Sequence, residues 1–166
     1  MRLATITILL LLIIASCNLH KKEDAQQMST NLTGITDSLN YYGKAWGTEF
    51  EIAVKTRDFT HLQPMRENMQ DYIESNIIST VAMKDVGDSK QLRESLLDIL
   101  HYEKDTILPK LTVFEHFDNT TDEQTITAAY KDMIATSPAD LKKYETMFRY
   151  LDEYAEKNDF PKPLNK

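Results

Sequence analysis

The sequence predicts an all-α protein, an antiparallel four-helix-type bundle that follows a signal peptide and a flexible tether. Apolar residues recur at spacings of three and four from about residue 36 onward, which places them on one face of a helix. No stretch alternates apolar and polar residues as a half-buried strand does. Capping residues, prolines and glycines separate the apolar stripes by short connections, as in antiparallel bundles.

The first segment of the chain is typical of a secretory signal. Met1 and Arg2 precede an uncharged run over residues 3–15, rich in leucine and isoleucine. Such a run is shorter than the roughly 20 residues that a membrane-crossing helix needs. We therefore expect residues 1–16 to be a signal peptide that is removed and takes no part in the fold.

The boundary Ile14-Ala15-Ser16-Cys17 resembles the lipobox of bacterial lipoproteins. The resemblance implies that the Cys17 thiol receives a diacylglycerol, which would hold the protein on a membrane; two or more fatty chains together bind firmly. An ordinary signal peptide followed by a chance cysteine, or an uncleaved anchor, is the alternative. Because Cys17 is the sole cysteine, no disulfide is expected.

Residues 17–35 are expected to be the lipidated cysteine and a flexible tether, because the segment is polar and shows no apolar periodicity. A random coil over residues 18–33 would hold the domain roughly 20 to 24 Å from the anchor. Within it, Lys22-Glu23-Asp24 resembles the signal that sends Bacteroidota lipoproteins to the cell surface. The expected location is thus the cell envelope, at the outer membrane and with possible surface exposure.

The charge balance argues against one class of partner. The formal net charge is −7 and becomes −8 when Arg2 is removed with the signal peptide. An acidic body is repelled by nucleic-acid phosphates and by anionic headgroups. We expect no nucleic-acid partner, and expect membrane association to come from the lipid.

Five helical segments are expected within a bundle domain over residues 36–160. The first covers 37–55, where Gly43 and Gly47 indicate either a close approach by another helix or a weakened turn. The second begins near Thr60 with a Thr60/Gln63 capping box; Asn76 on its stripe would fix register if buried, but a position at the rim is the default.

The third segment is expected to start at Asp88 or Ser89 and to run about 30 residues, with a kink at Pro109. A short fourth helix follows a Thr121/Gln124 capping box. Ser137-Pro138, a cap followed by a first-turn proline, restarts the chain as the fifth segment, which makes the last unit of the bundle a split one. Residues 161–166 are expected to be a polar tail.

Catalytic signatures are missing from the sequence, so we expect no enzyme and no cofactor. It holds no glycine-rich phosphate loop, nucleophile elbow or His-Glu-x-x-His box. Asp98 and His101, three residues apart on one helix face, are the only metal candidates. We expect them to be solvated polar residues on the flank of a helix, so no metal site is assigned.

Two other features bear on modification and contact. Asp37-Ser38-Leu39 resembles the Bacteroidota O-glycosylation signal, which makes Ser38 a candidate; a second such triplet at Asp105-Thr106-Ile107 falls inside a helix and is set aside. Tyr41 and Tyr150 lie off the apolar stripes, where exposed aromatic residues often mark contact surfaces.

In layout, the chain resembles uncharacterised helical surface lipoproteins of leptospires and Bacteroidota. The resemblance implies an envelope-localised bundle of unknown activity and supplies no catalytic residues. We expect a non-enzymatic bundle that acts in interaction or structure, with an envelope protein or glycan as partner. The alternative is a bundle that binds a metal or small ligand between its helices.

Overall fold

The structure, a computed structural model, describes the backbone of residues 2–162 and the side chains of residues 21–162. Every regular element in this part of the chain is a helix, and it contains no strand. The predicted all-α fold is therefore confirmed. The signal peptide, the lipobox and Cys17 lie outside the residues whose side chains are described, as does the tail from residue 163 onward.

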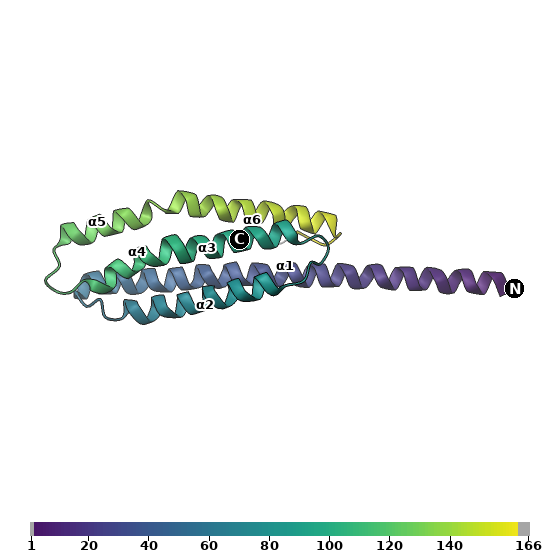
Figure 1. Ribbon diagram of the computed structural model, residues 1–166, viewed down its shortest axis with the longest axis horizontal. Helices are drawn as coiled ribbons and strands as arrows, with labels where there is room; N and C mark the ends of the chain where they lie inside the picture. The colour runs from purple at the N-terminus through teal and green to yellow at the C-terminus, as the bar shows by residue number, and fades with distance from the viewer. Residues whose placement is uncertain (1, 163–166) are drawn as a thin grey trace.

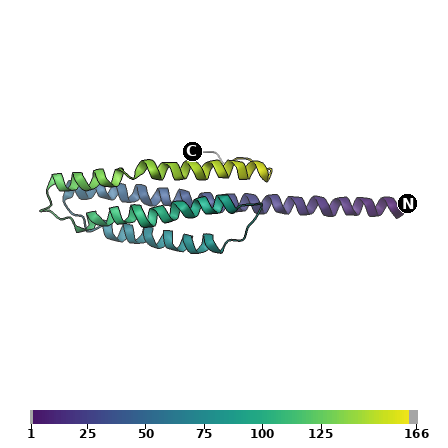
Figure 2. The same cartoon turned by 45° about the horizontal axis from the view of Figure 1, so that its top comes forward.

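The helices form an elongated bundle of four rods that lie side by side (Figures 1 and 2). They are α1 (Arg2–Thr56), α2 (Leu62–Ala82), a third rod that starts with α3 (Lys90–Tyr102), and a fourth made of α5 (Glu123–Ile134) and α6 (Ser137–Lys157). Successive rods run in opposite directions and are joined by short turns, as predicted. α1 packs on α2, α2 on α3 and α3 on α6, whereas α1 and α6 contact each other much less.

The third rod is continuous but changes its winding. α3 is followed by a π-helical turn (η1, Glu103–Ile107), by α4 (Leu108–Thr112) and by a 3-10 turn (η2, Val113–His116). Pro109 has no N–H to donate, and its ring would clash with the carbonyl four residues earlier in an α-helix. A wider turn immediately before Pro109 avoids both problems, and the Leu108 N–H bonds to the Glu103 carbonyl five residues back. The predicted disturbance at Pro109 thus takes the form of a π-turn.

Side-chain and backbone contacts fix both ends of the bundle. At one end Arg57 adopts a left-handed conformation (φ 62°), ends α1 and donates from its guanidinium to the Thr121 carbonyl at 3.1 Å. At the other end Gly87 is also left-handed (φ 56°), and a Cβ there would lie 2.2 Å from Asn158 Oδ1. The Tyr154 hydroxyl donates to the Val86 carbonyl at 2.8 Å beside it. The rods are therefore tied together at each end.

The prediction of a flexible tether is wrong for residues 21–35, because these residues are part of α1 and several of their side chains lie in the core. Ala25, Met28, Leu32 and Ile35 are buried at spacings of three and four. Ser29 and Thr36 are buried on the same face, and the Thr36 hydroxyl donates to the Thr33 carbonyl at 2.8 Å, which satisfies it inside the helix. The sequence pattern does not reveal this stripe, because four of its six residues are alanine, methionine, serine and threonine.

Several local details differ from the predictions. Thr60 and Thr121 do not cap their helices: α2 has no side-chain cap, and Asp122 caps α5 by accepting from the Thr125 N–H. α6 starts at Ser137, one residue earlier than expected, because Thr136 and not Ser137 occupies the cap position, where it makes no side-chain cap bond. Asn76 is half-buried and donates to its own helix at the Tyr72 carbonyl, in agreement with a position at the rim.

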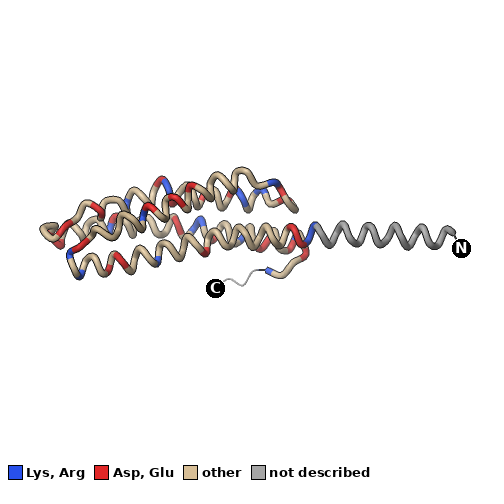
Figure 3. Tube along the Cα trace, turned by 90° about the horizontal axis from the view of Figure 1, so that it is seen from below, with Lys and Arg blue, Asp and Glu red and all other residues tan. Residues whose placement is uncertain are grey.

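Acidic and basic residues are interspersed along the described rods (Figure 3). The ion pairs are mostly local, such as Arg149–Glu153 at 2.9 Å, or join neighbouring rods, such as Lys104–Glu74 at 3.1 Å. None of the described helices combines the length and apolar character that crossing a membrane would require.

Candidate functional site

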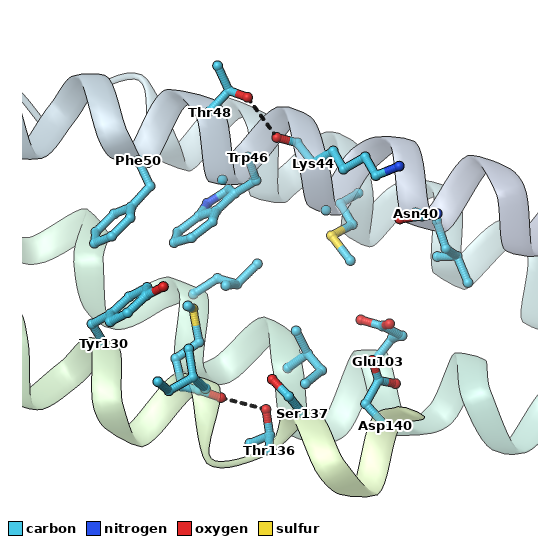
Figure 4. Close-up of a pocket in the computed structure, with 18 of the residues that line it drawn as sticks. Asn40, Lys44, Trp46, Thr48, Phe50, Glu103, Tyr130, Thr136, Ser137 and Asp140 are labelled. Carbon is cyan, nitrogen blue, oxygen red and sulfur yellow. Dashed lines mark hydrogen bonds between the residues drawn. The ribbon is translucent and has the colours of Figure 1, made fainter. Parts of the chain in front are cut away.

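The weak contact between α1 and α6 leaves a large open cleft along the bundle. Its volume is about 1620 Å³. One wall is α1 from Thr36 to Lys55, the other is α5 and the first half of α6, and Glu103, Ile107 and Leu111 of the third rod line its base. Figure 4 shows side chains from both walls pointing into the space between the helices.

One end of the cleft is aromatic. Phe50 stacks on Trp46 with ring centroids 5.3 Å apart and on Tyr130 of α5 at 5.7 Å, with both pairs nearly parallel. Phe114 packs edge-on against Phe50 at 4.7 Å. We call Trp46, Phe50 and Tyr130 the aromatic cluster. It joins α1 to α5 and gives this end rigid, flat apolar walls.

The other end is acidic. Glu103 and Asp140 lie side by side with their carboxyl groups in the cleft (Figure 4), and we call them the acidic pair. Glu103 is only 6% exposed, and its one hydrogen bond is a long one, accepted from the Tyr144 hydroxyl at 3.5 Å. Asp140 Oδ1 is buried and has no hydrogen-bond partner among the described residues. The acidic pair is therefore poorly compensated by the chain itself.

Burial and mutual repulsion raise the pKa values of this pair. Burial raises the pKa of Glu103 to about 8, and the nearby negative charge of Asp140 adds to the effect. Burial also raises the pKa of Asp140, although Lys143 opposes the rise. The pKa of the Tyr144 hydroxyl is raised by burial and by both carboxylates. At neutral pH Glu103 is therefore mainly protonated and can donate as well as accept a hydrogen bond.

Two further features of the α1 wall concern space and hydrogen bonding. A Cβ built on Gly43 or Gly47 would meet no atom within 4 Å. No helix approaches closely at these glycines, so the suggestion that they mark a close helix contact is wrong. Instead, both glycines leave the cleft open. The Trp46 side chain is 4% exposed, yet its Nε1 donor has no partner in the described part of the chain.

The residues singled out from the sequence fall elsewhere. Asp98 pairs with Lys143 at 2.7 Å on an outer face, and His101 is exposed. No group of three or more His, Cys, Asp or Glu side chains that could hold a metal ion occurs within the described residues. Ser38, the glycosylation candidate, lies inside α1 and donates to the Gly34 carbonyl at 2.9 Å. It is therefore helical, like Thr106 of the triplet that was set aside for that reason. Tyr41 is 70% exposed, whereas Tyr150 is half-buried beneath Arg149.

Glu103 and Asp140 were not expected to act together, although the sequence carried a signal for Glu103. It interrupts the apolar stripe between Leu100 and Ile107 at the spacings of three and four that the stripe follows. A charged residue in that position is predicted to be buried. Its pairing with Asp140 depends on how two distant rods pack, which no local pattern reveals.

Comparisons bring no further assignment to the site. The chain matched no protein-family model, no curated protein and no solved structure.

Proposed function

We propose that this chain is an envelope lipoprotein, anchored by lipid on Cys17, whose bundle binds a small apolar ligand in the cleft without converting it chemically. The observation that carries the binding role is the cleft itself: a large, partly aromatic space with a few polar groups is the usual form of a ligand site. The lipid anchor rests on the lipobox resemblance alone. Together they describe a binding module held at a membrane surface.

The loose packing of α1 against α6, on the side of the bundle where the cleft lies, supports this proposal. A bundle whose only task is structural gains stability by closing its walls, because about 25 cal/mol is gained for each Å² of apolar surface removed from water. Here Leu141 and Ile134 stay 61% and 42% exposed beside the cleft. A ligand that covers these side chains would gain the free energy that the closed bundle forgoes.

Trp46 provides a direct test, because it is the only tryptophan of the chain and lies in the cleft wall. The full-length chain, carried in phosphatidylcholine vesicles, is titrated with 8-bromo-octanol, a neutral ligand whose bromine quenches tryptophan on contact. Saturable quenching of Trp46 is expected. Emission that falls only linearly, as with random collisions, would overturn the binding role.

A matched pair of variants locates the binding. Gly43→Leu places a side chain in the cleft, whereas Gly34→Leu places one in equally open space on the same helix but outside it. We expect Gly43→Leu to weaken binding by about tenfold or more, since the ligand loses its space, and Gly34→Leu to leave it within about twofold. Equal effects of the two variants would place the ligand elsewhere.

The broader role in interaction at the envelope has one supporting observation. Tyr41 is 70% exposed on α1 and makes an edge contact with Tyr42 at 6.1 Å, which leaves most of its ring free for a partner protein or glycan. Crosslinking in intact cells tests this second role. A product that forms with the wild-type chain and is lost in Tyr41→Ala supports it, and an unchanged product contradicts it.

A further inference from the structure

The chemistry of the acidic end restricts which ligand fits the cleft. Asp140 and Glu103 face the same space, and within the described chain neither has a cation as hydrogen-bonded partner: Lys143, three residues from Asp140, bonds to Asp98 at 2.7 Å and acts on Asp140 only through its charge. Buried carboxylates are normally paired with a cation or fully hydrogen-bonded. The acidic pair thus has unused capacity to bind a positive group.

The charged groups around the pair leave this conclusion unchanged. Tyr144 of α6 donates one long hydrogen bond to Glu103, and α1 brings Asp37 and Lys44 to the same cleft. Lys44 is exposed and forms no ion pair with either acid among the described residues, and Asp37 adds a further negative charge. Because Glu103 is mainly protonated at neutral pH, the free hydrogen-bonding capacity of the pair, and not a large negative charge, is what favours a cationic head.

The distance between the two ends sets the size of the ligand. Asn40 lies opposite the acidic pair, and Trp46 and Phe50 follow it along α1 (Figure 4). At about 1.5 Å per residue, the six to ten residues between them span roughly 9 to 15 Å. A ligand with a polar head at the acidic pair and an apolar body of that length reaches the aromatic cluster.

We propose that the cleft selects organic amines: a protonated amine bound between Glu103 and Asp140, with an aromatic or aliphatic body lying on Trp46 and Phe50. This rests on the proposed binding function and names its ligand class. The poorly compensated acidic pair at one end of the cleft and the aromatic cluster at the other point to a ligand that is both charged and extended. The flat aromatic walls accept its body.

A matched series of three ligands tests the selection. 4-Phenylbutylamine, 4-phenylbutanol and 4-phenylbutyrate share one apolar body and differ in head charge. Each competes with 8-bromo-octanol for the full-length chain in phosphatidylcholine vesicles at pH 7, and recovery of Trp46 emission reports displacement. The amine is expected to bind about 10- to 100-fold more tightly than the alcohol, because charge-assisted hydrogen bonds are the stronger ones, and the anion most weakly.

Variants of the acidic pair identify its role. Glu103→Gln and Asp140→Asn keep the shape of the cleft and are each expected to remove most of the preference for the amine, with alcohol binding kept within about threefold. Glu94→Gln, an exposed glutamate on α3 outside the cleft, is the control and should retain the preference. Calorimetry adds a second readout: amine binding should release a proton from Glu103 at pH 7, so that the measured enthalpy changes with the ionisation enthalpy of the buffer.

The possible outcomes separate the two proposals. Equal affinity for the three ligands, or a preference for the anion, overturns amine selection and leaves the binding function standing if Gly43→Leu still blocks displacement. A preference for the amine that survives in both Glu103→Gln and Asp140→Asn also overturns it. Failure of all three ligands and of 8-bromo-octanol to act on Trp46 overturns both proposals together.

Discussion

Glu103 is the residue in which fold and proposed function conflict most directly. It occupies a position on the apolar stripe of the third rod and is the first residue of the π-turn that precedes Pro109. An isoleucine or leucine there would pack without loss, whereas a buried carboxyl group costs free energy unless it stays protonated or is paired. π-turns of this kind are rare and frequently occur at functional sites. A ligand that pairs with Glu103 would offset the free energy lost by burying its carboxyl group.

The raised pKa of Glu103 predicts a pH-dependent stability. The folded state holds this proton up to about pH 8, whereas the unfolded chain releases it near 4.5. Between these values the folded state binds more protons, so the free energy of unfolding falls as pH rises, by as much as about 5 kcal/mol over the interval. Urea unfolding at pH 5, 7 and 9 measures this fall.

Glu103→Gln should flatten most of that pH dependence and be more stable than wild type at pH 9. Glu94→Gln is the matched control on α3 and should keep the wild-type profile. A Glu103→Gln profile that falls as steeply as wild type would show that other groups cause the pH dependence.

At the scale of single helices, α1 carries the main disagreement with the sequence. The core stripe begins by Ala25, where a tether was predicted. Leu32 is fully buried, and its truncation to alanine is expected to lower the free energy of unfolding by about 2 to 5 kcal/mol. Gln26→Ala, at an exposed position of the same segment, should stay within about 0.5 kcal/mol of wild type. If Leu32→Ala were as stable as Gln26→Ala, the segment would not be part of the core and the prediction of a flexible tether would hold.

The glycines of α1 give a prediction of opposite sign. Gly43 and Gly47 lie inside a long helix, where glycine is less favourable than alanine by roughly 0.5 to 1 kcal/mol, and an added Cβ meets nothing within 4 Å. Gly43→Ala and Gly47→Ala should each raise the midpoint of thermal unfolding. Lower midpoints would mean that another group packs against these positions.

How far the sequence predicts the elements depends on the kind of information they need. The end of the first segment, read from its apolar stripe, and the start of the fifth, read from Ser137-Pro138, agree with the structure within a residue or two. The caps predicted at Thr60 and Thr121 are wrong: Asp122 caps α5 instead of Thr121, and α2 begins after Thr60 without a side-chain cap. The cleft was not predicted at all: the separation of α1 from α6 is a property of how four rods pack, and each rod has an ordinary stripe.

At the scale of the whole molecule, anchoring and binding are separable. If Cys17 carries the lipid, Cys17→Ala expressed in a bacterial host should incorporate no labelled fatty acid and should accumulate as an unprocessed or soluble product. The bundle, which has no other cysteine, should keep its helical circular-dichroism spectrum. Normal membrane fractionation of Cys17→Ala would rule out the lipid anchor and leave the cleft unaffected.

The central claim is that the space between α1 and α5–α6 holds a ligand. Photolabelling of the full-length chain with a diazirine derivative of octanol, followed by mass spectrometry of the peptides, tests it most directly. Adducts are expected within residues 43–50 of α1 and 130–141 of α5–α6; Gly43→Leu should greatly reduce them and Gly34→Leu should not. Adducts confined to the outer face of α2, or spread evenly along the bundle in all three proteins, would contradict it.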